Sequence, residues 1–157
     1  MRGFALVSVA VLGACNGGGD VTIDVTHDVC SSITVASPAA TEVQTTGIDD
    51  AIGLWRQHGV DTLERTEGGT LEIRFERAAE AFHGVYDDEH GVIYINTVIT
   101  DPRALSIVIA HELGHAFGLD HIAGRPSLMN AGNTHTMPTA EDDLAVQALW
   151  GPCPVAQ

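Results

Sequence analysis

One stretch constrains this chain more than any other: residues 111–121 read His-Glu-Leu-Gly-His-Ala-Phe-Gly-Leu-Asp-His. Its first half has the pattern H-E-x-x-H, and side chains four apart on an α-helix lie on the same face. His111 and His115 are therefore predicted to bind one metal ion together. Glu112 is expected beside that ion, close enough to act on a water molecule without binding the metal itself.

Gly118 is the predicted end of this helix, because glycine adopts the left-handed conformation of a helix C-cap at no steric cost. The turn would then present His121 as a third nitrogen ligand. Three imidazoles with one open position are typical of catalytic zinc, whereas structural zinc sites are closed by a fourth protein ligand. We therefore predict one catalytic Zn²⁺ bound by His111, His115 and His121, with Glu112 as the catalytic residue beside it.

The flanking sequence argues against a chance match. An isolated H-E-x-x-H also occurs on ordinary helices and is weak by itself. Here the glycine and the third histidine fall at the required offsets as well. Residues 105–110 are apolar apart from Ser106, so the helix is expected to be buried and to hold its histidines rigidly.

The stretch resembles the signature of the metzincin metallopeptidases, H-E-x-x-H-x-x-G-x-x-H followed by a Met-turn. Residues 127–130, Ser-Leu-Met-Asn, are similar to that turn, and Met129 follows His121 at the separation expected of matrixins. Residues 139–151 also resemble the C-terminal helix of matrixins. The likeness is sharp over residues 101–151 and only architectural before them. It implies a zinc-dependent endopeptidase, with Met129 as a packed floor beneath the zinc and not as a ligand.

The resemblance also implies how a peptide or protein substrate would bind. The substrate would lie extended along an exposed sheet edge near residues 84–86. Residues 130–138 would shape the pocket for the side chain just after the cleaved bond. Matrixins carry a Pro-x-Tyr wall there, and the residues that follow Met129 lack both. They also lack the tyrosine that astacin-like members use as an extra zinc ligand.

Matrixins hold further structural cations in a loop between their sheet strands, and this chain keeps only a short acidic stretch in that region. The residues there that could bind an additional structural cation are His83, Asp87, Asp88, Glu89 and His90. Ligand types without a defined spacing do not establish a metal site. A solvent-exposed acidic turn is the alternative interpretation.

Hydrophobic periodicity and turn residues predict an α+β fold. Strands are predicted at residues 21–26, 32–35, 70–76, 82–86 and 92–95, and helices at 46–59, from Asp101-Pro102 through the metal-binding motif, and from Thr139 to residue 151. The resemblance makes this a metzincin-like zincin fold: a twisted, mostly parallel sheet, an active-site helix, a Met-turn and a C-terminal helix.

Two of these helices have predicted buried stripes. The first is formed by Ile48, Ala51, Ile52, Leu54 and Trp55. In the last helix the residues expected to pack are Leu144, Ala148 and Leu149. Both predictions rest on the spacing of apolar residues at helical periodicity.

Length and charge limit the possible partners. The chain has 157 residues, which suits one domain with a substantial core. It has 7 basic residues, all arginine, against 21 acidic ones, and a formal net charge of −14. Such a charge argues against nucleic acid or an anionic membrane surface as a partner. We expect a monomer that acts on peptide or protein substrates.

The first residues are typical of an export signal. Arg2 precedes an apolar run that is too short to span a bilayer, so residues 1–14 are predicted to be a signal peptide. The run ends in Leu-Gly-Ala-Cys, which resembles a bacterial lipobox and implies lipid attachment at Cys15. The alternative is ordinary secretion with an incidental cysteine. Residues 15–20 would form a flexible tether and residues 21–157 the metallopeptidase catalytic domain.

Cys30 and Cys153 remain, one near each end of the mature chain. In an exported protein such a pair is most simply a disulfide between the two ends of the domain. The alternative is that Cys30 binds the zinc as an inhibitory thiolate, as a cysteine in matrixin propeptides does. The motif that surrounds that propeptide cysteine is absent here, so the disulfide is preferred.

Two further function classes remain open at this point. The domain could be a zinc-binding module without proteolytic activity at the cell envelope, although the intact Glu112 argues against it. It could instead hydrolyse another amide, in the cell wall. We expect the protein to be exported, and to be either lipid-anchored to the cell envelope or secreted.

Overall fold

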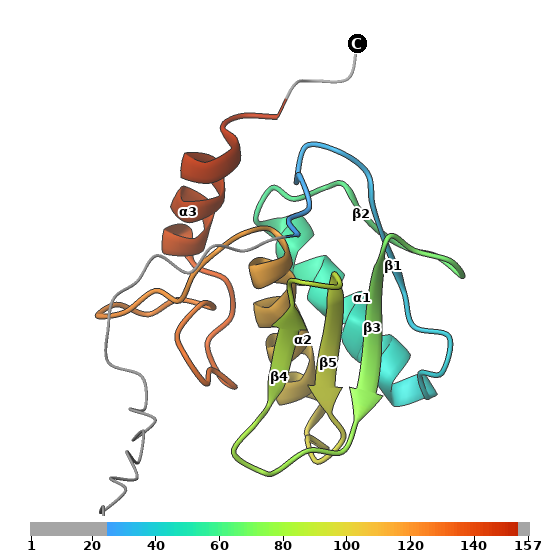
Figure 1. Ribbon diagram of the computed structural model, residues 1–157. Coiled ribbons are helices and arrows are strands. Elements are labelled where there is room, and N and C mark those ends of the chain that lie inside the picture. Colours follow the sequence, from blue (N-terminus) through green and yellow to red (C-terminus); the bar gives the residue numbers. More distant parts are fainter. Residues whose placement is uncertain (1–24, 154–157) are drawn as a thin grey trace, which may run out of the picture.

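The computed structural model describes residues 25–153, and these residues form one five-stranded sheet with three helices (Figure 1). The elements in chain order are β1 (Ile33–Ala36), α1 (Glu42–Gln57), β2 (Leu63–Arg65), β3 (Leu71–Glu76), β4 (Gly84–Asp87), β5 (Val92–Asn96), α2 (Pro102–Ala116) and α3 (Ala140–Trp150). The predicted α+β fold is confirmed.

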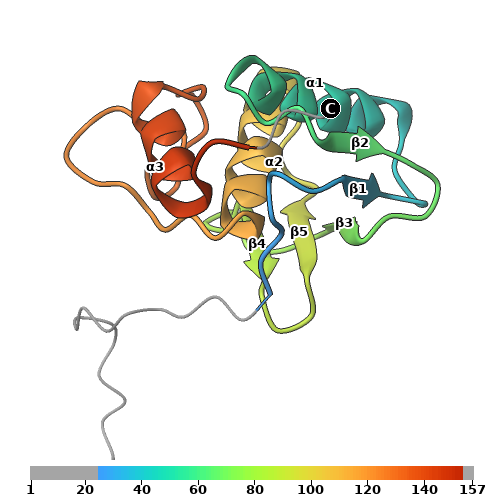
Figure 2. The same cartoon turned by 90° about the horizontal axis from the view of Figure 1, so that it is seen from above.

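The sheet has the strand order β2-β1-β3-β5-β4. All neighbouring strands are parallel except β4, which is an edge strand and runs antiparallel to β5. Helices α1 and α2 lie against one face of the sheet, and α3 stands apart from the sheet beyond α2 (Figures 1 and 2). The predicted mostly parallel sheet is therefore confirmed, and its exposed edge borders α2.

The core lies between the sheet and the two covering helices. Trp55 of α1 is fully buried, donates a hydrogen bond of 2.8 Å from Nε1 to the carbonyl of Ala110, and packs edge-on against Phe117. Helix α1 comes close to α2 at Gly47, where a Cβ atom would lie 3.1 Å from the side chain of Leu105. These contacts fix α2, which carries His111 and His115, two of the three predicted metal ligands.

The structure differs from the prediction at α1 and β2. Helix α1 begins at Glu42 and not near residue 46, because Thr41 and Gln44 form a capping box that starts the helix a turn earlier. Strand β2 was not predicted, since Leu63 is the only apolar residue in it and three residues show no periodicity. It exists because its backbone pairs with β1.

The packing predicted for the last helix is wrong. Leu144 and Leu149 are 59% and 51% exposed, and Ala148 is exposed as well. The buried residues of α3 are Asp142 and Val146. The stripe of α1 is confirmed, with Leu54 only half-buried. Among the described strands and helices, none packs along α3, so an apolar spacing alone did not identify its buried face.

A disulfide joins Cys30 to Cys153 and connects the segment before β1 to the segment after α3, as predicted. The predicted signal peptide, Cys15, the tether and most of the predicted strand at 21–26 lie outside the described residues. The two described residues of that strand, Val25 and Thr26, are not in a strand. Among the described helices, none has the length and apolar character needed to cross a membrane.

Candidate active site

Helix α2 positions His111, Glu112 and His115. It begins at Asp101, whose carboxylate accepts a hydrogen bond of 2.7 Å from the backbone of Ala104, and Pro102 occupies the first turn. From Leu105 onwards nearly every residue of the helix is buried. The backbone that carries the ligands is therefore held by packing on most of its sides.

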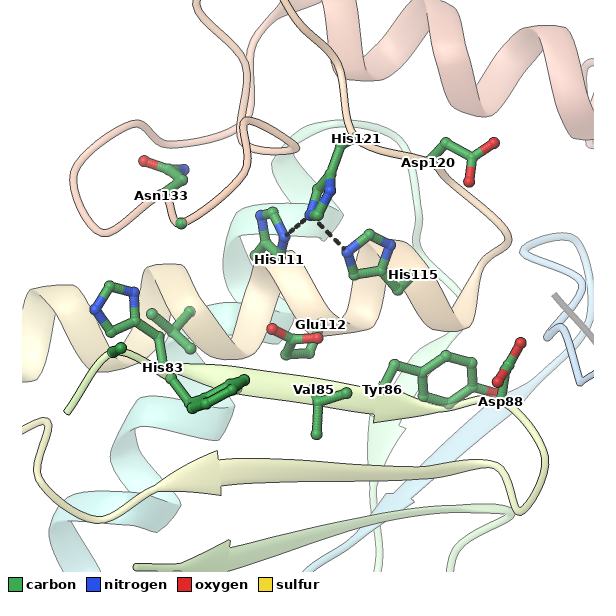
Figure 3. A pocket seen from close by; sticks show the side chains of 15 residues that line it. His83, Val85, Tyr86, Asp88, His111, Glu112, His115, Asp120, His121 and Asn133 are labelled. Carbon is green, nitrogen blue, oxygen red and sulfur yellow. Dashed lines mark hydrogen bonds between the residues drawn. The ribbon is translucent and has the colours of Figure 1, made fainter. Parts of the chain in front are cut away.

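The helix ends in a turn that redirects the chain towards the site. Gly118 has a φ of 91°, and the backbone N–H groups of Gly118 and Leu119 donate to the carbonyls of His115 and Gly114. This is the Schellman arrangement, in which a glycine just after the C-cap adopts the left-handed conformation. The chain then delivers His121 opposite the two helical histidines (Figure 3).

The three imidazoles converge at their Nε2 atoms. His121 Nε2 lies 3.2 Å from His111 Nε2 and 3.3 Å from His115 Nε2. Within residues 25–153, these three residues form the group of histidine, cysteine and acidic side chains whose ligand atoms meet, all within 4.8 Å of one another. The structure therefore brings together the three predicted ligands.

Hydrogen bonds determine which nitrogen of each ring faces the centre. Nδ1 of His111 lies 2.8 Å from the carbonyl oxygen of Leu128, and Nδ1 of His115 lies 2.7 Å from that of Leu119. A carbonyl only accepts, so both Nδ1 atoms carry hydrogen and both Nε2 atoms present a lone pair. His121 Nε2 carries at most one hydrogen, so it cannot donate a hydrogen bond to both of these Nε2 atoms.

A shared cation resolves this conflict. An ion ~2.0–2.1 Å from two nitrogens at the tetrahedral angle separates them by about 3.3–3.4 Å, close to the two distances in the site. The three side chains therefore fit a zinc ion in both donor chemistry and spacing. Carbonyls that orient the rings through Nδ1 are the usual outer contacts of such histidines.

Burial keeps two of these rings neutral. It lowers the pKa of His111 to about 4, although the hydrogen bond to Leu128 acts in the opposite direction. Burial lowers the pKa of His115 as well. Because only the neutral imidazole binds a metal, both residues are in the binding form at neutral pH.

Glu112 lies between α2 and β4, and its side chain points towards the strand (Figure 3). It is only 5% exposed. Burial raises its pKa to about 8, and the backbone N–H of Tyr86 partly opposes this rise. A Cβ atom at Gly84 would lie 2.8 Å from Glu112 Oε1, so the absence of a side chain there leaves room for the carboxylate.

Met129 is fully buried against the turn of α2 that separates His111 from His115. It packs against Gly114, where a Cβ atom would collide with the methionine sulfur. The turn around it is held from α3 by Asp142, whose carboxylate accepts hydrogen bonds from the Ser127 hydroxyl and from the backbone N–H groups of Leu128 and Met129. The sequence analysis did not identify this role of Asp142, because the contact joins segments that meet only in the folded structure.

The site opens into a cleft of about 500 Å³ between β4 and α2. His83 and Asn133 lie towards one end of the cleft and Asp88 and Asp120 towards the other, with the histidine cluster between them (Figure 3). Asn133 belongs to the segment 130–138 that the resemblance placed at the pocket, but the sequence did not single it out, because one asparagine in a loop gives no signal by itself.

The acidic turn after β4 forms no comparable cluster. His90 Nδ1 lies 2.9 Å from Asp87 Oδ2, a local contact between neighbours three residues apart. Within the described part of the chain, the histidine cluster is the group whose ligand atoms lie close enough together to bind one metal ion. The structure therefore gives no support to the predicted additional cation.

The sheet has an antiparallel edge strand, three imidazoles converge from a helix and the turn after it, and a methionine is buried against that helix. Together these features define a zinc metalloprotease of the metzincin class. The family model described as Matrixin matches residues 66–151, slightly more than half of the chain. The chain belongs to the matrixin family.

A solved structure supports the fold. The crystal structure of myroilysin aligns with a TM-score of 0.60 over 78% of this chain and 84% of that chain. The two sequences are 12% identical. A likeness at this identity concerns the fold, and the site is argued from the residues of this chain.

Proposed function

We propose that this protein is a zinc-dependent endopeptidase in which His111, His115 and His121 bind the metal and Glu112 is the general base. The observation that carries the proposal is the convergence of three Nε2 atoms beside a buried carboxylate in an open cleft. The one hydrogen bond from the backbone N–H of Tyr86 does not offset the burial of this carboxylate, whose pKa is raised to about 8, so a purely structural role does not explain it.

The bound zinc would polarise the scissile carbonyl and lower the pKa of a coordinated water molecule from ~15.7 towards ~7. The protein supplies the proton transfer. Glu112 accepts the proton of the attacking water and returns it to the nitrogen of the leaving amine. The carbonyls of Leu128 and Leu119 hold the rings of His111 and His115 in the orientation that directs Nε2 to the centre.

The substrate would bind as an extended strand beside β4. Among the described strands only β5 pairs with β4, so the other edge of β4 is open to a peptide, apart from the Tyr86 N–H that contacts Glu112. Val85 on β4 is 53% exposed and lines the cleft. A complex with a peptide inhibitor whose backbone binds elsewhere would exclude this arrangement.

The first prediction concerns Glu112. Glu112→Gln is expected to retain zinc and to lower kcat by ~10²–10⁴-fold, since the amide cannot accept the proton of water. Zinc content is measured by elemental analysis and turnover with a fluorogenic peptide. Glu89→Gln, in the exposed turn after β4, is the control and should leave both unchanged. Undiminished turnover by Glu112→Gln would rule out the role of general base.

A mixed peptide library, incubated with and without a chelator, distinguishes the remaining function classes. Chelator-sensitive cleavage inside peptides supports the endopeptidase. No cleavage of peptides, together with release of fragments from purified cell wall, would identify a hydrolase of a cell-wall amide. No hydrolysis of either, with zinc bound, would identify a zinc-binding module.

The disulfide indicates an exported protein, because such bonds persist in oxidising compartments. We further propose that residues 1–14 are removed and that Cys15 carries a lipid that anchors the catalytic domain through the tether at 15–20. The second prediction is that Cys15→Ala releases the protein from the membrane fraction into the soluble fraction, as measured by immunoblotting. Retention of the variant in the membrane fraction would exclude the anchor.

A further inference from the structure

Asn133 lies four residues after Met129, in the loop of residues 130–138 that follows the Met-turn. It lines the cleft together with Gly132, at the opposite end from Asp120 (Figure 3). The notable property of Asn133 is that its side chain is half-buried and wholly engaged in hydrogen bonds within the protein.

The amide of Asn133 makes four hydrogen bonds, all to backbone groups. Its Oδ1 accepts from the N–H groups of His135 at 3.1 Å and Thr136 at 2.8 Å. Its Nδ2 donates to the carbonyls of Leu128 at 2.9 Å and Thr136 at 2.7 Å. These partners can only donate or only accept, so they determine which atom is oxygen and which is nitrogen. The full capacity of the amide is used.

One of these bonds leads directly to the metal site. The carbonyl of Leu128 accepts from Asn133 Nδ2 and also lies 2.8 Å from His111 Nδ1. A carbonyl oxygen has two lone pairs, and both are occupied here. The position of this oxygen sets the orientation of the His111 ring, and Asn133 holds the oxygen from the side of the loop.

We propose that Asn133 is a positioning residue that couples the loop bordering the cleft to the orientation of His111. It holds residues 130–138 in the conformation that bounds the cleft and, through the same side chain, it fixes the carbonyl that orients a metal ligand. The proposal rests on the proposed function in that this end of the cleft receives a substrate side chain. It predicts that a substitution of Asn133 changes two properties together: the side-chain selectivity of the cleft and the affinity of the site for zinc.

Asn133→Asp is the variant that tests the coupling most directly. Aspartate has the same shape and keeps the two bonds accepted from His135 and Thr136. It loses both donors and places a carboxylate oxygen against the carbonyls of Leu128 and Thr136. Asn133→Ala, which removes all four bonds without adding a charge, is the second variant in case the aspartate variant does not fold.

Two measurements are made on each variant. The dissociation constant for zinc is measured by competition with a chromophoric chelator, and we expect an increase of about 10–100-fold. The affinities of two peptide hydroxamates, one with a methyl and one with an indole side chain for this end of the cleft, are measured at saturating zinc. We expect their ratio to shift by about tenfold towards the larger side chain, because the loop is no longer held.

Leu63→Ala is the matched control for a general loss of stability. Leu63 is fully buried in β2, at the edge of the sheet opposite to β4. This variant is expected to lower the melting temperature and to leave the zinc affinity and the hydroxamate ratio unchanged. If it changes either quantity as much as the Asn133 variants do, the effect is one of stability and the proposal is overturned.

A change in both measurements at Asn133 supports the coupling. Wild-type values in both, or a change in only one of them, overturn it. Neither measurement requires hydrolysis. A wild-type protein that cleaves no peptide would therefore refute the proposed function, while the zinc and hydroxamate affinities would still decide the role of Asn133.

Discussion

At the scale of single residues, Asp142 makes more of the contacts that hold the Met-turn than any other side chain described for α3. Its carboxylate is fully buried and accepts hydrogen bonds from the Met-turn and from Thr139 at the start of α3. A buried carboxylate is stable only when its oxygens are satisfied, and here donors surround both of them. Helix α3 therefore supports the metal site mainly through one residue.

The third prediction concerns this residue. Asp142→Asn replaces one acceptor oxygen with a donor that faces the N–H groups of Leu128 and Thr139. We expect a loss of about 2–4 kcal/mol in the free energy of unfolding, measured with urea, because two buried donors lose their partner. The neighbouring variant Asp143→Asn, at a partly exposed residue that contacts His58, should cost less than ~1 kcal/mol. Equal losses would contradict the role of Asp142.

The same variant tests a pH dependence. Burial acts to raise the pKa of Asp142, but the hydrogen bonds from Ser127, Leu128 and Thr139 outweigh it and lower the pKa below its usual 3.8. The charged form is favoured by folding, so its stabilisation is complete above pH 3.8 and is lost as the pH falls through the lower native pKa. The difference between wild type and Asp142→Asn should therefore narrow below about pH 3.8.

At the scale of elements, α3 is the least enclosed helix. Its outer residues Leu144 and Leu149 are exposed, and Trp150 reaches back to donate a hydrogen bond of 2.9 Å to the carbonyl of Phe117. The disulfide at Cys153 holds the chain just beyond its end. The helix is thus attached at its two ends and, between them, buries mainly Val146. So few buried apolar contacts are typical of a segment that unfolds locally at low free energy.

The fourth prediction follows from this attachment. The double variant Cys30→Ser and Cys153→Ser opens a loop with a sequence separation of 123 residues. The chain-entropy model gives a loss of about 4–5 kcal/mol in the free energy of unfolding. We expect hydrogen exchange to increase first in α3 and the Met-turn and least in α2, which lies in the core. Uniform acceleration in all three would show that α3 is not a separate unit.

At the scale of the whole molecule, the protein joins a larger part of regular secondary structure to a smaller part that is largely irregular before α3. The sheet, α1 and α2 enclose the core, whereas the segment from His121 to α3 is irregular up to residue 139. His111 and His115 belong to the larger part and His121 to the smaller one. A metal bound by all three would therefore connect the two parts as well as take part in catalysis.

The fifth prediction concerns zinc removal. A ligand that binds only the folded state adds ~4 kcal/mol at a concentration 1,000 times its dissociation constant. For a domain of this size, this corresponds to a fall of about 10–20 °C in Tm on chelation. Differential scanning calorimetry with chelator and after zinc is restored measures it. An unchanged Tm would contradict a metal site whose ligands come from both parts of the molecule.

The sequence alone predicted what depends on neighbours along the chain. The ligands of the metal lie within eleven residues, so helical periodicity and one glycine determine how they meet. The strands β3 and β5 and the start of α2 were likewise predicted, because alternation and capping are local patterns. The early start of α1 was also local, yet it was missed because the capping box formed by Thr41 and Gln44 was not recognised in the sequence.

Only the tertiary structure decided the rest. Strand β2 exists through its pairing with β1, and α3 buries Asp142 rather than its leucines because the Met-turn lies against that face. The same holds for Asn133, whose importance comes from a carbonyl it shares with His111 across the fold. Such contacts join residues that the chain brings together only on folding. The spacing of residues in the sequence contains no signal for them.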